Sequence, residues 1–243
     1  TEGGISGIIT PGRIPRLWVE DEQNGYPFLS STDILQSDLS NVSYIAKSAA
    51  RQNSQLLIKE RWTLITRSGT IGRMAYSRAD MNGMACTEDV LRVIPDESKV
   101  KPGYLYAYLC SRFGVPLIIS GTYGAIIQHI EPQHIANLPV PRLGTVEDQA
   151  HELIQSAADL RVEAAKLLKT AGQMVNEQFG FPEKLALSHR VFSCSTASST
   201  LVLKRLEATF HDAVAQESDR LLADVQRKDK FSSLGIAISE TGR

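Results

Sequence analysis

Two patterns of apolar residues divide the chain near Gly144. Before this point the apolar residues occur in short runs interrupted by turn residues, which is typical of a β-rich domain with irregular loops. The runs are Ile5–Ile9, Pro27–Leu29, Leu56–Ile58, Trp62–Ile65, Val90–Ile94, Val115–Ile119 and Ala125–Ile130. Helical spacing within this region predicts a helix over Tyr104–Arg112, entered through Pro102 and Gly103, and a second short helix over Glu131–Asn137.

From Val146 the apolar residues follow a helical pattern that ends at Gly180 and Pro182. Their spacing alternates between 4 and 3 residues, which is a heptad stripe. One of the two stripe positions is alanine in every repeat, so a second helix would be able to approach closely. The pattern therefore favours a coiled-coil helix over residues 145–180; the alternative is an amphipathic helix that lies on its own domain. The seam residues are Ala150, Leu153, Ala157, Leu160, Ala164, Leu167 and Ala171.

The C-terminal part of the chain predicts a linker and then another helix. Residues 181–200 end in a Ser- and Thr-rich stretch, and Leu201–Val225 has apolar residues at helical spacing. The segments "ISGIITPGR" (5–13) and "IAISETGR" (236–243) both read as a short strand followed by Thr and then Gly-Arg. This similarity suggests a repeat, in which the chain ends where a second copy of the first domain begins.

The predicted fold class is α+β. Residues 1–144 form a mixed, β-rich globular domain with short helices, and residues 145–180 form a long helix. Residues 181–200 form a linker, and residues 201–243 form a helix and strand that open a second domain.

Composition and charge add few constraints. The chain has 243 residues, of which 42% are hydrophobic and 22% charged, and its formal charge of −1 gives no global basic field. Three cysteines without a CxxC pattern predict a reducing, cytoplasmic setting rather than a disulfide framework. No apolar run reaches the roughly 18 residues that a membrane-spanning helix needs, so we expect no membrane association.

Catalytic motifs are not found in the sequence. The five histidines form no HExxH pattern, and there is no GxSxG and no P-loop. "SGTIG" and "SGTYG" each contain GxxG, but neither leads into a convincing helix, so a dinucleotide site is not supported. We therefore expect no catalytic residue, no metal site and no cofactor.

Four polar loops that contain or adjoin glycine remain: "TPGRIPRLWV", "PFLSSTDI", "TRSGTIGR" and "SGTYGAIIQHI". Arginine grips guanine or phosphate with two hydrogen bonds, glutamine does the same for adenine, and hydroxyls bind phosphate oxygens. The loops therefore suggest a DNA-binding surface. In the alternative interpretation they are ordinary turns, with Gly69 and Gly72 at positive φ. The candidate DNA-binding residues are Arg13, Arg16, Ser30, Ser31, Thr32, Arg67, Ser68, Thr70, Arg73, Tyr123 and Gln128.

The order of these segments resembles the specificity subunit of type I restriction–modification systems. The matching segments are "RIPRLWVEDEQNGYPFLSSTDI", "KERWTLITRSGTIGRMAY", "YLYAYLCS", "SGTYGAIIQHIEPQHIANLPVPRL" and "EDQAHELIQSAADL", between about Arg13 and Gln178. "KRLEATFH" (204–211) is similar to the start of the next recognition domain in that family.

The resemblance implies a fold and a non-enzymatic function. A target recognition domain reads one half of a split sequence in double-stranded DNA, and long helices pair as an antiparallel spacer. Methyltransferase subunits dock on the specificity subunit, and a restriction and translocase subunit joins in the full complex. The "TRSGTIGR" loop then lies beside the DNA. Alternatively, this loop belongs to the scaffold, and segments such as 38–56 and 76–88 read the bases.

A full specificity subunit has two recognition domains and two long helices, whereas this sequence contains one such pattern and the start of another. The resemblance thus implies either a fragment or a half-length subunit that dimerises through its long helix. Two other functions stay open: a coiled-coil adaptor that does not read DNA, and the recognition part of a fused DNA methyltransferase.

Overall fold

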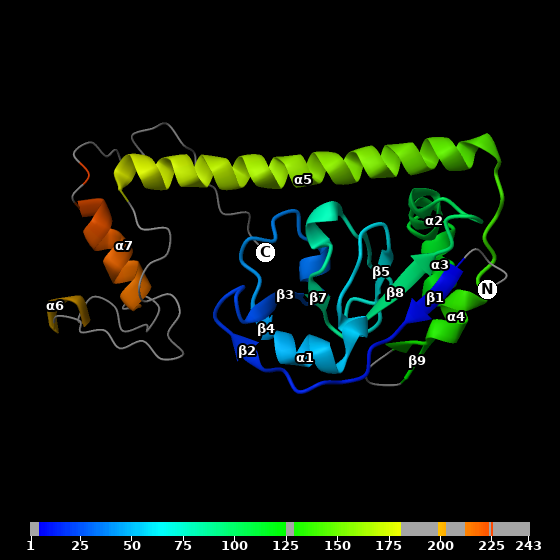
Figure 1. Cartoon of the computed structure of the whole chain (residues 1–243), viewed down its shortest axis with the longest axis horizontal. Helices are drawn as coiled ribbons and strands as arrows, with labels where there is room; N and C mark the ends of the chain where they lie inside the picture. The colour runs from blue at the N-terminus through cyan, green and yellow to red at the C-terminus, as the bar shows by residue number, and fades with distance from the viewer. Residues whose placement is uncertain (1–4, 125–128, 181–198, 203–211, 224, 226–243) are drawn as a thin grey trace. The chain divides into compact units, whose positions relative to one another are not determined.

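The computed structural model describes residues 5–124, 129–180, 199–202, 212–223 and 225 of the chain. The chain divides into two compact units, Thr1–Lys169 and Thr170–Arg243. The first unit contains the sheets, several short helices and most of the long helix α5, Thr145–Phe179 (Figure 1). The predicted fold class is confirmed: a mixed β-rich domain with short helices precedes a long helix.

The larger sheet is antiparallel and has the strand order β1-β8-β5-β6. The strands are β1 (Ile5–Ile9), β5 (Thr63–Thr66), β6 (Met74–Tyr76) and β8 (Val90–Pro95). Ile9 lies opposite Arg92, and Thr66 lies opposite Val90. The register therefore places the carboxyl ends of β1 and β5 at the same end of the sheet as the start of β8.

The second sheet has the strand order β2-β4-β3-β7. The strands are β2 (Trp18–Val19), β3 (Gly25–Leu29), β4 (Tyr44–Ala46) and β7 (Ala85–Cys86). β3 and β7 run parallel with Leu29 opposite Cys86, so their carboxyl ends meet. The backbone N–H of Thr87 extends this contact by donating to Leu29 O at 2.9 Å. A separate two-stranded hairpin consists of β9 (Thr122–Tyr123) and β10 (His129–Ile130).

The short helices are α1 (Lys47–Gln52), α2 (Pro102–Leu109), α3 (Gly114–Ile119) and α4 (Pro132–Ala136). The predicted helices over Tyr104–Arg112 and Glu131–Asn137 correspond to α2 and α4, each of which begins at a proline. Leu105 and Leu109 of α2 pack with residues of β5 and β8 in the main hydrophobic cluster. This packing fixes α2 and α3 beside the larger sheet (Figure 1).

The apolar run Val115–Ile119, which the sequence pattern groups with the β-type runs, is helical. The Ser111 side-chain oxygen accepts hydrogen bonds from the N–H groups of Phe113 and Gly114, which satisfies donors at the start of α3. Gly114 lies against the backbone of α2, where a Cβ atom would come within 2.5 Å of the Leu109 carbonyl oxygen. Tertiary packing thus decides the conformation of a run too short for periodicity to classify.

The long predicted helix is confirmed as α5, whose start is held by Glu147. The Glu147 carboxylate accepts from Leu143 N at 2.7 Å and from both Nε and an NH2 group of Arg142, at 3.0 and 2.9 Å. The hydrogen bonds from Arg142 are the main reason that the pKa of Glu147 lies below its ordinary value. Among the described residues, no helix is both long and apolar enough to span a membrane.

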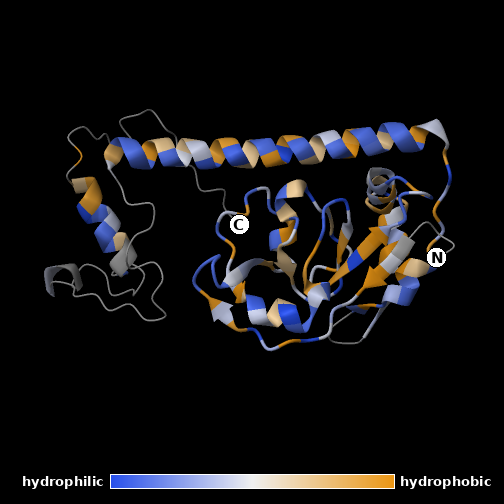
Figure 2. Cartoon of the chain, in the orientation of Figure 1, coloured by the Kyte–Doolittle hydropathy of each residue, from blue (hydrophilic) through white to orange (hydrophobic). Residues whose placement is uncertain are grey.

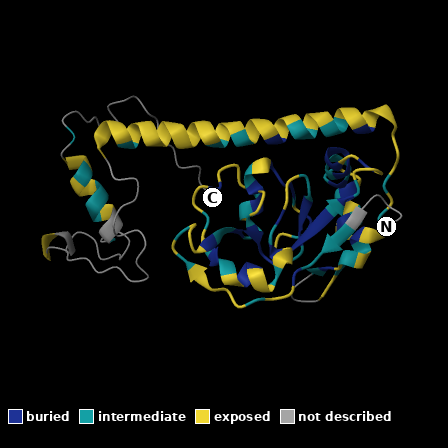
Figure 3. Cartoon of the chain, viewed as in Figure 1, coloured by how far each residue is buried: buried dark blue, intermediate teal, exposed yellow. Residues whose placement is uncertain are grey.

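One face of α5 packs on the β-rich domain, and the predicted seam lies on a different face except at Ala150, which is half-buried and packs against the main hydrophobic cluster. Ala158 is buried, the Tyr76 hydroxyl donates to Gln155 Oε1 at 3.2 Å, and Gly103 N donates to His151 Nδ1 at 3.1 Å. The apolar stripe that includes Leu153 and Leu160 is instead exposed to solvent, as Figures 2 and 3 show along the helix. The alternative of a helix lying on its own domain therefore holds for one face, while the coiled-coil seam stays a prediction.

The contact between His151 and Gly103 predicts a loss of stability in mild acid. Burial, followed by the positive charges of Arg61 and Lys101, holds the pKa of His151 below its ordinary value of 6.5. As the pH falls below 6.5, His151 becomes protonated in the unfolded chain before it does in the folded one. The free energy of unfolding therefore decreases from its value above pH 6.5 until the pH reaches the lower pKa of the folded state. When the pH is lowered from 7.5 to 5.5, we expect the urea concentration at the unfolding midpoint to decrease more in the wild type than in His151→Gln. An equal decrease in the two proteins would contradict this expectation.

In the C-terminal unit the structure describes two helical segments besides the end of α5. These are α6 (Ser199–Val202) and α7 (Ala213–Ala223), and they fall within or beside the helix predicted over Leu201–Val225. α6 begins within the last two residues of the stretch assigned to a linker. The predicted strand near 236–243 and the family-like segment 204–211 lie outside the described residues.

Candidate nucleic-acid interface

The polar loops converge at one end of the two sheets. Arg67 N donates to Asp89 O at 2.9 Å, and Arg16 NH2 reaches the hydroxyl of Thr87 at 3.2 Å. The parallel pairing of β3 with β7 brings the loop after Leu29 to the same place. We call this region the loop surface. Its segments are residues 10–17, 30–33, 67–73, 87–89 and the described residues of the β9–β10 hairpin.

The "TRSGTIGR" segment is a closed loop between β5 and β6. The side-chain oxygen of Thr66 accepts from Arg73 N at 3.1 Å and donates to the Thr70 carbonyl, which ties the two ends together. Gly69 and Gly72 have φ angles of 71° and 77°, in the left-handed region that favours glycine. The prediction that these glycines shape the turn is confirmed. The loop therefore has a defined backbone on which its polar side chains are displayed.

Arg67 joins this loop to the β9–β10 hairpin. Its Nε donates to Ile130 O at 3.1 Å, and its NH2 group lies 3.3 Å from Glu131 Oε1. The Tyr123 hydroxyl donates to the same carboxylate oxygen, and this hydrogen bond raises the pKa of Tyr123 above its ordinary value. Two predicted site residues, Arg67 and Tyr123, are thus brought together on one carboxylate.

Arg16 is held in a similar way by the turn before β8. Its NH2 group lies 3.2 Å from both the Thr87 hydroxyl and Glu88 Oε2, and its guanidinium stacks 5.4 Å from the Phe28 ring centre. Burial opposes ionisation of Glu88, but hydrogen bonds from its own backbone N–H and from Arg16 outweigh burial and hold the pKa below its ordinary value. The Arg16 side chain is therefore held in place by Thr87 and Phe28, and its charge is neutralised by Glu88.

The side chains of Arg13 and Arg73 are exposed, as is 40% of the Arg16 side chain, but Arg13 and Arg73 differ from the two arginines above in their contacts. Within the part of the chain that the structure describes, neither makes a side-chain hydrogen bond or ion pair. Thr70 is also exposed, and Ser68 is half-buried beside it. These residues have the accessibility that a contact to a nucleic acid requires.

The segment after β3 has a local structural role. The Ser30 side-chain oxygen accepts from Asp33 N at 3.2 Å, and Asp33 Oδ2 accepts from Ser30 N at 2.9 Å. This reciprocal pair closes the turn, as the ordinary-turn alternative predicts for Ser30. Thr32 is exposed and Ser31 half-buried, so they keep donors at the surface. Gln128 lies outside the described residues.

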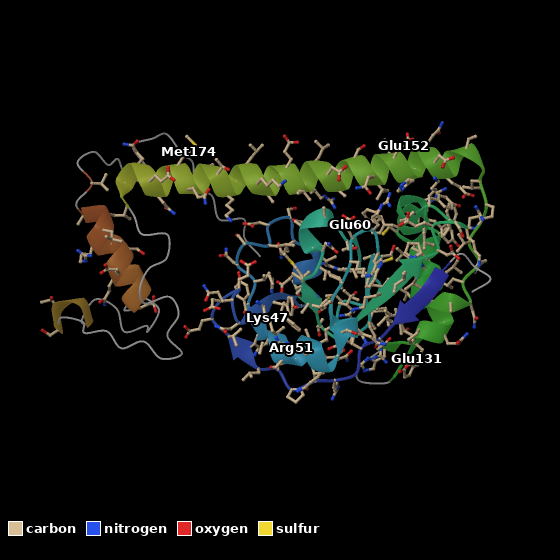
Figure 4. All side chains as sticks on the ribbon, in the orientation of Figure 1. Lys47, Arg51, Glu60, Glu131, Glu152 and Met174 are labelled. Atoms are coloured by element: carbon tan, nitrogen blue, oxygen red, sulfur yellow. The ribbon has the colours of Figure 1, made fainter. Side chains whose placement is uncertain are left out.

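Several charged residues near the loop surface were missed by sequence reasoning. Glu88 and Glu131 are single acids in loops, and no sequence pattern connects them with the arginines they contact. Lys47 and Arg51 lie on α1, whose preceding residue Ala46 donates its N–H to Leu17 O at 2.8 Å (Figure 4). Arg51 is exposed, and Lys47 Nζ donates to Gln23 O at 2.8 Å. Their four-residue spacing on a six-residue helix is too short a signal to find them.

Neither a metal-binding cluster nor a reactive Cys86 thiol is present among the described residues. No three His, Cys, Asp or Glu side chains among them are grouped closely enough to hold a metal ion. Cys86 is fully buried, and burial raises the pKa of its thiol to about 11, which keeps it protonated and unreactive in the folded domain. The described side chains of the loop surface supply hydrogen-bond donors from arginine, serine and threonine.

Comparisons with known proteins give likenesses in structure, two of which are described below, and none in sequence. No protein-family model matches the chain, and no curated protein matches it. The crystal structure of a type I restriction–modification S subunit from M. genitalium matches with a TM-score of 0.49 and 12% identity, over 74% of this chain and 43% of that chain. A structure described as showing complex assembly and conformational transition of the type I R-M system matches with a TM-score of 0.44 and 16% identity, over 76% and 45%.

The chain spans less than half the length of each of these two chains. At identities this low, only the chain's own residues can point to its function.

Proposed function

We propose that the chain is a DNA-recognition subunit of a type I restriction–modification complex, which binds one half of a bipartite target and docks methyltransferase subunits. The observation that carries the proposal is the convergence of the polar loops at one end of the sheets. The segments that resemble the family's recognition domain are distant in sequence, and three of them, 13–34, 59–76 and 120–143, contribute to the loop surface. Strand pairing brings these loops together, and the arginines and hydroxyls that they carry then form a single surface.

The arginines of the loop surface would perform two kinds of contact. Arg13 and Arg73 are exposed and free to approach either guanine edges or phosphates, while Thr70 and neighbouring N–H groups suit phosphate oxygens. Arg16 and Arg67 are already oriented by protein contacts, so binding DNA costs them little side-chain entropy. Lys47 and Arg51 would extend the basic surface along the duplex.

The long helix would provide the docking surface for other subunits. Its apolar seam is exposed in a single chain, with Leu153, Leu160 and Leu167 at 72%, 65% and 63% exposure. Large apolar side chains at heptad spacing bury themselves against a second helix when one is present. The expected partners are methyltransferase subunits, the restriction and translocase subunit of the full complex, and a second recognition domain or a second copy of this chain.

The test of the proposal is selection of a randomised DNA duplex library on the full chain. The selection is made with and without a type I methyltransferase subunit, at two salt concentrations. We expect a short consensus that survives the higher salt when the methyltransferase is present. If no sequence is enriched under any condition, the chain is not a DNA reader in this form.

Arg73→Ala is expected to weaken DNA binding without changing stability, because the side chain is exposed and makes no contact among the described residues. Loss of a phosphate contact should weaken binding to all DNA sequences and reduce the slope of log affinity against log salt concentration by about one. Loss of a base contact should instead cost roughly 1–3 kcal/mol of binding free energy at one base pair of the target only. Fluorescence anisotropy over a salt series distinguishes the two.

The matched control is Arg61→Ala, because Arg61 precedes β5 and so lies at the opposite end of the larger sheet, paired with Glu97 at 3.0 Å. Binding by this variant should equal that of the wild type. Equal weakening by Arg61→Ala and Arg73→Ala would show that bulk charge, not the loop surface, binds the DNA.

A second candidate function is a coiled-coil adaptor that does not read DNA. The exposed seam of α5 favours it, because this surface would serve an adaptor equally well. Capture of a partner subunit without any DNA preference would support the adaptor. Methyl transfer by the chain itself would instead support the third alternative, a fused methyltransferase.

A further inference from the structure

We infer that Glu88 and Glu131 are specificity-determining residues that restrain non-specific DNA binding by neutralising Arg16 and Arg67. The inference rests on the proposed function and concerns the same surface. Each carboxylate lies on an arginine that would otherwise attract any phosphate. These arginines then strengthen DNA binding only where the other contacts to the DNA are favourable enough to outweigh the repulsion between carboxylate and phosphate.

The first observation is that the two pairs have the same arrangement. Arg67 NH2 lies 3.3 Å from Glu131 Oε1, and Arg16 NH2 lies 3.2 Å from Glu88 Oε2. The Glu131 side chain is 50% exposed and projects at the edge of the domain, where Figure 4 labels it. Glu88 is adjacent to Asp89, whose carbonyl oxygen accepts from Arg67 N. The two pairs are therefore neighbours on one surface.

The second observation is that neither arginine needs its carboxylate to stay in place. Arg67 is anchored by its Nε bond to the carbonyl oxygen of Ile130, at 3.1 Å. Arg16 is anchored by the Thr87 hydroxyl and by stacking on the Phe28 ring. The carboxylates therefore add negative charge to arginines that other groups already orient.

The consequence is a surface with a small net charge in spite of its arginines. Arg13, Arg16, Arg67 and Arg73 are opposed by Asp33, Glu88, Asp89 and Glu131. Non-specific binding to DNA depends almost entirely on positive charge, whereas specific binding also uses base contacts. A carboxylate beside an arginine thus weakens non-specific binding more than specific binding, which increases discrimination.

The test compares Glu131→Gln and Glu88→Gln with the wild type, using the full chain and a random-sequence duplex. Glutamine keeps the shape and an oxygen acceptor but removes the charge. We expect each variant to bind the random duplex about tenfold more tightly near 0.1 M salt. The slope of log affinity against log salt concentration should also be steeper by about one. Affinity for the sequence selected by the library should rise less, so the ratio of specific to non-specific affinity should fall.

Glu97→Gln is the matched control. Glu97 pairs with Arg61 at 3.0 Å just beyond β8, at the end of the sheet away from the loop surface, and its substitution makes the same change in net charge. Its binding should equal that of the wild type. Thermal unfolding by circular dichroism checks that all three variants are folded.

Each other outcome overturns the inference and points to a different cause. If all variants bind like the wild type, the carboxylates do not restrain binding, although the proposed function stands. If Glu97→Gln tightens binding equally, net charge alone is responsible. If neither wild type nor variants bind any duplex, the proposed function fails together with the inference.

Discussion

Arg92→Ala is expected to lower the free energy of unfolding by about 3–4 kcal/mol, measured by urea denaturation. Arg92 is fully buried in β8, and its guanidinium donates to the carbonyl oxygens of Thr87, Val90, Cys86 and Leu56. Burial lowers the pKa of Arg92, but arginine stays charged, so these carbonyl groups are its compensation. Removing the guanidinium group leaves these buried carbonyl oxygens without hydrogen-bond donors and opens a cavity.

The same substitution should also disturb the loop surface, because three of the four acceptors, the carbonyl oxygens of Cys86, Thr87 and Val90, belong to the turn that carries Glu88 or flank it. Arg51→Ala is the matched control, since Arg51 is exposed on α1. Its effect on stability should stay within about 0.5 kcal/mol. Equal urea midpoints for the two variants would mean that the buried guanidinium group of Arg92 contributes nothing to the free energy of unfolding.

Leu160→Lys is expected to abolish association through α5 while leaving the free chain as stable as the wild type. Leu160 is 65% exposed in the single chain, so a lysine costs nothing there. In a helix–helix seam the same lysine would be buried without a partner, which costs several kcal/mol. A loss of about 3 kcal/mol lowers an association constant more than a hundredfold. Analytical ultracentrifugation, and co-purification with a methyltransferase subunit, measure the effect.

The control for this variant is Glu152→Gln, which makes the same change in net charge at an exposed position of α5 outside the seam (Figure 4). It should associate as the wild type does. If Leu160→Lys also associates normally, the exposed stripe is not the docking surface, and the coiled-coil prediction is wrong.

The helices show what local pattern can predict. α2, α4 and α5 were all predicted from apolar spacing with a proline at the start or a glycine at the end, because the signals for a helix lie within a few residues of one another. α3 was not predicted, since its conformation depends on Gly114 packing against α2. β1, β3, β5 and β8 were predicted as short apolar runs, whereas β2, β4, β6, β7 and β9 were not, and the run Leu56–Ile58 forms no strand. The order of the strands in the two sheets was not predicted either.

The loop surface was predicted only in part. The polar loops were identified from their glycines, hydroxyls and arginines, and the positive φ angles of Gly69 and Gly72 confirm the turn that the ordinary-turn alternative predicts, while the DNA-binding role of the loop stays a prediction. The pairing of Arg16 with Glu88 and of Arg67 with Glu131 was not predicted. These partners are separated by 72 and 64 positions, and such contacts leave no periodic signal in a single sequence.

By itself the sequence determined the division into a β-rich domain and a long helix, the apolar stripe along that helix, and the residue types of the polar loops. These features depend on neighbours in the chain. Only the tertiary structure decided which loops meet, which arginines are neutralised, and which face of α5 packs on the domain. That face uses His151, Gln155 and Ala158, whose polar or small side chains give no hydrophobic pattern, because hydrogen bonds and close packing hold it in place.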